Sequence, residues 1–198
     1  MQSFHAPCVF LVMLYLATTP VFAQTNQREV PVNQSPQSLN LVNSNEKLHY
    51  WLFLPEGYEP KGNDTKWPLM IFLHGHGERG SDLAKVKQWG PPKRVANQPD
   101  FPFVVVSPQL SEEFHNWQME PLEQLVKHSI QSLNVDPKRV YLTGLSMGGR
   151  GSWALAAKMP KQFAAVLPIC GGGKPETADT LLDLPIWAFH GDADRVVP

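Results

Sequence analysis

Thr143-Gly144-Leu145-Ser146-Met147-Gly148-Gly149 is the stretch of sequence that decides the fold. It follows a short apolar run at 139–142 and opens onto a helix-like segment at 153–158, which gives the order strand, sharp turn, helix. A serine on such a turn has a strained backbone, so the residues two before and two after it must be small. Gly144 and Gly148 meet that need. The pattern Gly-x-Ser-x-Gly also arises by chance in glycine-rich turns, but the flanking strand and helix favour Ser146 as a nucleophile.

Length and composition indicate one domain with a small, weakly charged partner. The chain has 198 residues, of which 42% are hydrophobic and 18% charged, as in an ordinary globular domain. The formal net charge is −1, and no run of like charge marks a surface for nucleic acid or an anionic membrane. We therefore expect a small-molecule ligand and no nucleic acid.

The amino-terminal residues are typical of an export signal. Residues 1–23 contain no Lys, Arg, Asp or Glu, and an apolar core at 9–17 leads to Val21-Phe22-Ala23. We expect cleavage after Ala23 and a periplasmic or secreted protein, although an uncleaved amino-terminal anchor stays open. The apolar core is short for a membrane span, so none is expected in the mature chain. Residues 24–46 are rich in Gln, Asn, Ser and Pro, which predicts a disordered linker before a domain at 47–198.

The domain alternates apolar runs with helix-like segments. Strands are expected at 48–54, 68–73, 103–106, 139–142, 163–170 and 185–189, and helices at 121–133, 153–158 and 175–184. This alternation predicts an α/β fold with a mostly parallel sheet and helices on both faces.

A glycine-rich loop follows the buried strand at 68–73. His74-Gly75-His76-Gly77 can present a backbone N–H to a ligand with no side chain in the way, and His76 is the expected donor. A side-chain role for either histidine, as base or metal ligand, is less favoured because no acidic or cysteine partner stands at ligand spacing. Trp117 is a candidate wall of a substrate pocket, with ordinary packing as the alternative.

Three motifs together resemble the α/β-hydrolase superfamily. They are His74-Gly75-His76-Gly77, Gly144–Gly148 and His190-Gly191-Asp192-Ala193-Asp194, and within the superfamily they look most like the phospholipase/carboxylesterase branch with its predicted-peptidase and dienelactone-hydrolase-like relatives. The resemblance implies that Ser146 is the nucleophile, that the backbone N–H groups of Met147 and His76 form the oxyanion hole, and that Asp194 is the triad acid. Asp192 is the alternative acid. No cofactor or metal is implied.

The sequence departs from this family at the catalytic histidine, which the resemblance places after the acid. None of the seven histidines follows Asp194. The last apolar run, Ile186-Trp187-Ala188-Phe189, also has the composition of an interior strand. We therefore expect a truncated chain that lacks a C-terminal strand, a helix and the catalytic histidine, and that is itself nearly inactive.

The expected function is hydrolysis of carboxylic esters through a Ser-His-Asp triad and an acyl-enzyme. Two alternatives use the same residues differently. One is a serine peptidase of the prolyl-oligopeptidase-like type, and the other is a non-catalytic hydrolase-fold remnant that binds a ligand or partner.

Overall fold

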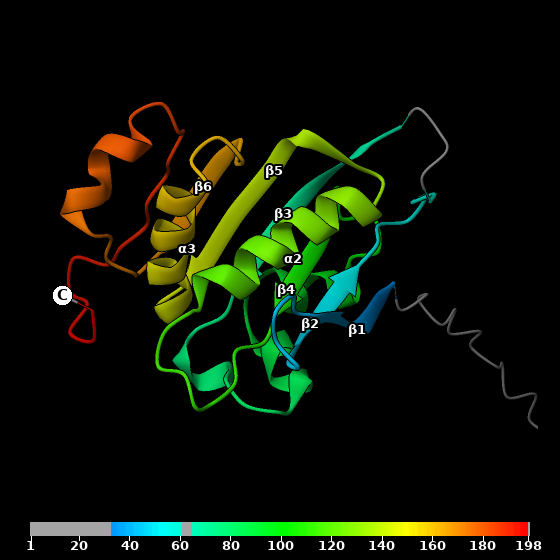
Figure 1. Cartoon of the computed structure of the whole chain (residues 1–198), viewed down its shortest axis with the longest axis horizontal. Coiled ribbons are helices and arrows are strands. Elements are labelled where there is room, and N and C mark those ends of the chain that lie inside the picture. Colours follow the sequence, from blue (N-terminus) through cyan, green and yellow to red (C-terminus); the bar gives the residue numbers. More distant parts are fainter. Residues whose placement is uncertain (1–32, 61–64, 198) are drawn as a thin grey trace, which may run out of the picture.

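One mixed sheet organises the chain. The computed structural model describes residues 33–60 and 65–197, and within them six strands lie in the order β1-β2-β4-β3-β5-β6 (Figure 1). The strands are β1 (Gln34–Asn40), β2 (Lys47–Phe53), β3 (Trp67–Leu73), β4 (Val104–Pro108), β5 (Val135–Leu145) and β6 (Ala165–Ile169). Pairing is antiparallel for β1 with β2 and for β2 with β4, and parallel from β4 through β3 and β5 to β6. The predicted mostly parallel sheet is confirmed.

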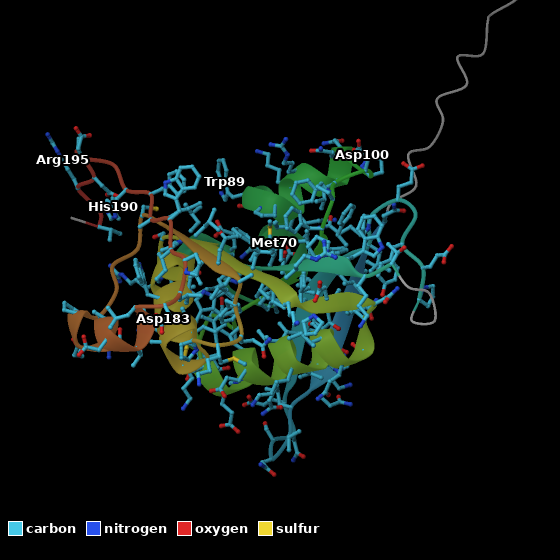
Figure 2. The ribbon with its side chains drawn as sticks, turned by 90° about the horizontal axis from the view of Figure 1, so that it is seen from above. Met70, Trp89, Asp100, Asp183, His190 and Arg195 are labelled. Atoms are coloured by element: carbon cyan, nitrogen blue, oxygen red, sulfur yellow. The ribbon has the colours of Figure 1, made fainter. Side chains whose placement is uncertain are left out.

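Helices cover both faces of this sheet. The helices α2 (Met119–Ser132) and α3 (Met147–Lys158) lie on one face, and the short α1 (Gly90–Arg94) lies on the other, where Met70 and Trp89 are labelled (Figure 2). The main apolar core fills the space between the sheet and the pair α2 and α3; its fully buried residues include Ile71, Leu125, Leu142 and Leu155. A smaller cluster of Phe53, Val95 and Val105 packs under the α1 segment. The alternation of strand side chains supplies apolar groups to both faces, as a sheet covered on both sides requires.

Short 3-10 helices fill the connections between these elements. They are η1 (His76–Glu78), η2 (Leu83–Gln88), η3 (Val95–Asn97) and η4 (Pro175–Leu181). The predicted helix at 175–184 is thus a 3-10 segment that begins with a proline. No helix in the described residues is both long and apolar enough to cross a membrane.

The last apolar run lies at the edge of the sheet next to β6. Parallel bridges join Val166 to Ile186 and Ile169 to Phe189, so this run follows the direction of β6 without becoming a full strand. Trp187 is 67% exposed and Phe189 41% exposed, and their rings lie 4.9 Å apart between centroids. In the described residues this end of the sheet therefore exposes aromatic side chains to solvent.

The expected linker at 24–46 is wrong for Gln34–Asn40, which form β1. These residues pair with β2 along its whole length, from Gln34 opposite Phe53 to Asn40 opposite Lys47. An edge strand is held by backbone hydrogen bonds and needs few buried side chains, so its mostly polar and exposed residues do not prevent it from forming. Residues 24–32 and the expected signal at 1–23 lie outside the described residues.

Two elements around the serine differ in extent from the prediction. Strand β5 begins at Val135 because Val135 pairs with Trp67, beyond an irregularity in the register between β3 and β5. Helix α3 begins at Met147, directly after Ser146, and not at 153. The glycines at 148, 149 and 151, which weaken helix propensity, are here part of the helix because its first turn packs against the ends of β3 and β6.

Candidate active site

Ser146 occupies a strained turn between β5 and α3. Its backbone angles are φ 56° and ψ −113°, outside the regions that non-glycine residues ordinarily adopt. Its backbone N–H donates a hydrogen bond of 2.8 Å to the carbonyl of Ile169 at the end of β6. The side chain is half-exposed. The structure therefore holds the serine in the conformation that the sequence predicts for a nucleophile.

The two glycines that flank Ser146 are required by contacts with backbone atoms. A Cβ at Gly144 would lie 2.3 Å from the carbonyl oxygen of Gly148, and a Cβ at Gly148 would lie 1.9 Å from the carbonyl oxygen of Leu73. Neither space can hold a carbon atom, and backbone atoms cannot rotate away as a side chain can. The sharp turn therefore depends on both positions, as the sequence motif indicates.

The loop His74–Gly77 lies beside the serine turn. A Cβ at Gly75 would be 3.4 Å from the carbonyl oxygen of Leu145 and 3.8 Å from the Cβ of Ser146. The side chain of His76 is exposed, and its Nε2 lies 2.6 Å from Nη2 of Arg79. Arg79 also donates to the carbonyl of His76 at 3.0 Å. The two segments predicted to supply an oxyanion hole are thus brought together, with the side chain of His76 engaged by Arg79.

His74 is a buried structural histidine. Its Nε2 accepts a hydrogen bond of 3.0 Å from the backbone N–H of Leu110, so the ring proton must be on Nδ1, which lies 2.6 Å from the carbonyl oxygen of Gly75. Trp117 packs on the imidazole with ring centroids 4.8 Å apart and donates its indole N–H to the carbonyl of His74 at 3.3 Å. Burial lowers the pKa of His74 to about 4, and the nearby Arg79 acts in the same direction. A side chain neutral at physiological pH therefore fixes the shape of the loop.

This network was missed by sequence reasoning, because its members lie far apart in the chain. Leu110 is 36 residues from His74 and Trp117 is 43 residues from it. Nothing in the local sequence indicates that they meet. Hydrogen bonds occupy both ring nitrogens of His74. That its side chain is disfavoured as base or metal ligand stays a prediction.

The low pKa of His74 makes stability depend on pH. The unfolded chain binds the proton with a pKa of about 6.5 and the folded chain with a pKa of about 4, so stability is full above pH 6.5 and falls as the pH drops through that window. The loss should be on the order of 3 kcal/mol between pH 6.5 and 4. Urea unfolding at several pH values measures it. His74→Gln should be less stable at pH 7 and have a flatter dependence between pH 6.5 and 4.

The control for this experiment is His115→Gln, which changes an exposed histidine in a loop. It should keep the dependence of the wild-type chain. An unchanged slope in His74→Gln would mean that His74 is not the titrating group.

Asp194 and His190 lie together at the C-terminal end of the described chain. Oδ2 of Asp194 is 3.6 Å from Nε2 of His190, and its Oδ1 accepts backbone hydrogen bonds from Val196 at 2.8 Å and Val197 at 3.0 Å. The N–H groups of Val197 and Val196 hold the pKa of this carboxyl below its usual value, with His190 adding a smaller effect in the same direction. Asp192, the alternative acid, is exposed. Asp194 is thus the better ordered of the two carboxylates.

Ser146 and the segment that carries Asp194 both follow the carboxyl ends of parallel runs in the sheet. Ser146 bonds to Ile169 at the end of β6, and the N–H of the next residue, Cys170, donates to the carbonyl of Phe189 at 2.8 Å. The segment that begins at His190 therefore lies two strands along from the serine, or roughly 10 Å at ordinary strand spacing. Within the described residues no hydrogen bond or ion pair joins the side chain of Ser146 to His190 or Asp194. Ser146 thus lies beside the His74–Gly77 loop, and Asp194 lies beside His190.

Trp117 is packed in the core and also borders a pocket, and its predicted role as a wall of a substrate pocket stays a prediction. It is 5% exposed and packs on His74, yet it also lines an open pocket of about 520 Å³ that runs along α3 and includes Met147, the residue after the serine.

Among the described residues no group of three or more His, Cys, Asp and Glu side chains is placed to hold a metal ion.

Known proteins that are similar to this chain in fold or sequence include enzymes named as esterases. A crystal structure of a thermostable esterase superposes with a TM-score of 0.67 and 33% identity, over 84% of this chain and 48% of that one. In sequence the chain is 26% identical over 146 residues to the bifunctional acetylxylan esterase/xylanase XynS20E of Neocallimastix patriciarum, and 31% identical over 130 residues to poly(3-hydroxyalkanoate) depolymerase C of Paucimonas lemoignei. These matches cover 71% and 57% of this chain but only 21% and 30% of the two relatives.

The mixed sheet, the strained serine turn and these similarities define an α/β-hydrolase. A model of the dienelactone hydrolase family matches residues 97–198, just over half of the chain. The protein belongs to the dienelactone hydrolase family.

Proposed function

We propose that this protein is a carboxylic ester hydrolase with Ser146 as its nucleophile. The observation that carries the proposal is the strained backbone of Ser146, which holds its half-exposed side chain beside the His74–Gly77 loop. The relatives whose names state an activity on esters, an acetylxylan esterase and a polyhydroxyalkanoate depolymerase, support the same class of reaction. The chain spans less than a third of their lengths, so the activity of the whole protein is part of the proposal.

In the proposed reaction Ser146 attacks the carbonyl carbon of the ester. Its hydroxyl proton passes to a histidine, and the negative charge on the carbonyl oxygen is stabilised by the N–H groups of Met147 and His76. The N–H of Met147 suits this role because it belongs to the first turn of α3, where N–H groups have no partner within the helix. Loss of the alcohol, which takes the proton from the histidine, leaves an acyl-enzyme that water then hydrolyses.

Asp194 is the proposed acid that orients the histidine. The low pKa of its carboxyl means that it is ionised at neutral pH, as a group that stabilises an imidazolium must be. We propose that the base is none of the seven histidines of this sequence, because His74 is held by two hydrogen bonds, His76 by Arg79, and His190 lies two strands from the serine. The 198-residue chain should accordingly be a very poor catalyst, since loss of the base costs about a millionfold in turnover.

Substrate class can be tested by comparing esters with peptides. With imidazole added as a soluble base, we expect p-nitrophenyl acetate and other short acyl esters to be hydrolysed. The matching p-nitroanilides of short peptides should be cleaved at a rate lower by a factor of about 100 or more, because an amine leaves only when a general acid protonates it, whereas p-nitrophenolate leaves without a proton. Release of p-nitrophenol and p-nitroaniline is followed by absorbance. Peptide cleavage as fast as ester cleavage would favour the peptidase alternative.

Covalent labelling separates an enzyme from a binding remnant. A fluorophosphonate probe, added with imidazole as a soluble base, should modify Ser146, as located by mass spectrometry of the labelled peptide. Ser132→Ala, which removes an exposed serine at the end of α2, should label like the wild-type chain. Failure of Ser146 to react would favour the non-catalytic alternative.

We also propose that the protein is exported, with cleavage after Ala23. The support is the uncharged amino-terminal stretch of residues 1–23 with its apolar core. Expression with this stretch intact, followed by amino-terminal sequencing of the protein from the periplasm or medium, tests the proposal. The mature chain should begin at Gln24.

A further inference from the structure

The pocket along α3 has largely apolar walls. Its volume of about 520 Å³ lies in the range typical of small-molecule sites, roughly 300–1,000 Å³. Its walls include two tryptophans and two methionines, namely Trp117, Trp153, Met119 and Met147. They come from the loop before α2, the start of α2 and two turns of α3, so the pocket lies next to the serine turn without including Ser146.

Both tryptophans line this pocket with their indole N–H groups already bonded. The indole N–H of Trp153 donates to the carbonyl of Gly171 at 3.0 Å, and that of Trp117 donates to the carbonyl of His74 at 3.3 Å. Each ring also lies against a glycine: a Cβ at Gly151 would be 2.7 Å from the Trp117 ring, and one at Gly173 would be 3.0 Å from the Trp153 ring. The polar group of each indole is thus already used, and the rings are held in place before any ligand arrives.

Two cations stand on the same pocket with no acidic side chain to neutralise them. Arg150 comes from α3 and Lys174 from the segment after β6, and both side chains are exposed. The lining contains no Asp or Glu. Within residues 33–60 and 65–197 neither cation has a hydrogen-bonding or ion-pairing partner. An apolar cavity with a positively charged rim is complementary to an anion that carries an apolar body.

We propose that this pocket binds a small aromatic monocarboxylate. The aromatic ring packs on the half-buried Trp153, with the nearly buried Trp117 completing the apolar wall, and the carboxylate faces Arg150 and Lys174. A guanidinium can hold both oxygens of a carboxylate, which gives that group preference over a neutral polar one. The site excludes Ser146, so the proposal stands apart from ester hydrolysis, and a failure of either leaves the other untouched.

Titration calorimetry with three probes tests the class of ligand. The probes are 3-phenylpropionate, its neutral amide 3-phenylpropionamide, and acetate, which has the charge without the ring. We expect 3-phenylpropionate to bind about three- to tenfold more tightly than the amide, as exposed ion pairs allow, and acetate not to bind measurably. Binding should weaken as salt rises, because the cations are exposed. Equal affinity for the acid and its amide, or no measurable binding of the acid at about 10 mM, would overturn the proposal.

Variants of the lining locate the site. Arg150→Gln and Lys174→Gln should each weaken binding of 3-phenylpropionate by about two- to fivefold. The matched control is Lys161→Gln, which removes one exposed positive charge outside the pocket and should change nothing. Ala154→Phe places a ring in the cavity from an exposed helix position, so it should abolish binding while circular dichroism shows an intact fold. Unchanged affinity in Ala154→Phe would show that the acid binds elsewhere and that the assignment is wrong.

Discussion

Ser146→Ala is expected to abolish imidazole-dependent ester hydrolysis by the 198-residue chain. If Ser146 is the nucleophile and the base is absent from these residues, imidazole in solution can take the proton of the hydroxyl. Positioned base catalysis is worth about 10²–10⁴-fold, so a freely diffusing base should raise the rate by roughly tenfold or more. The rate of p-nitrophenol release is measured against imidazole concentration, and the background reaction of imidazole itself is subtracted. The alanine variant should follow the background at every concentration.

Two further variants make this result specific. Ser132→Ala should respond to imidazole like the wild-type chain, because the hydroxyl of Ser132 lies at the end of α2 and donates to the backbone carbonyl of His128. His190→Gln should also respond, since His190 contacts Asp194 and the carbonyl of Val197 but not the serine. If His190→Gln instead removes hydrolysis seen without imidazole, then His190 is the base and the proposed division of roles is wrong.

Gly148→Ala is expected to cost the fold about 3 kcal/mol, the upper end of the usual range for an atom forced into a packed site. The new Cβ would stand 1.9 Å from the carbonyl oxygen of Leu73, so either β3 or the start of α3 has to move. For a chain of this size that loss corresponds to roughly 10 °C in Tm. Urea unfolding followed by circular dichroism measures the change, and labelling of Ser146 should fall with it because the turn is displaced.

Gly172→Ala is the matched control. A Cβ at Gly172 meets nothing within 4 Å, so this variant should stay within about 0.5 kcal/mol of the wild-type chain. Equal stability of Gly148→Ala and Gly172→Ala would show that the end of β3 yields easily and does not constrain the serine turn.

The sequence predicts the fold best where local pattern and tertiary contacts agree. The apolar run before Ser146 and the two glycines around it are read correctly, because the same close approach of backbone that the motif implies is present in the structure. Most strands are also found within a few residues of their predicted places, since buried parallel strands are continuous apolar runs. Strand β1 is missed because its stability comes from pairing with β2 and not from its own side chains.

The candidate site is predicted less completely than the fold. Sequence motifs single out Ser146, His76, Met147 and Asp194 as candidates one by one. They cannot show that the segment with Asp194 lies two strands from Ser146 or that Asp194 contacts His190. The buried network around His74 and the cationic rim of the α3 pocket are also invisible in the sequence. Both depend on residues that meet only after the chain has folded.

The position of the Ser146 turn is set almost wholly by main-chain atoms of three neighbouring strands. The carbonyl of Leu73 in β3 limits how closely α3 can approach, and the end of β5 leads into the turn. The carbonyl of Ile169 in β6 accepts a hydrogen bond from the backbone N–H of Ser146. Side chains nearby can therefore change over evolution, or in the hands of an engineer, without shifting the hydroxyl. In a scaffold of this kind the surrounding loops can be exchanged while the hydroxyl of Ser146 keeps its position.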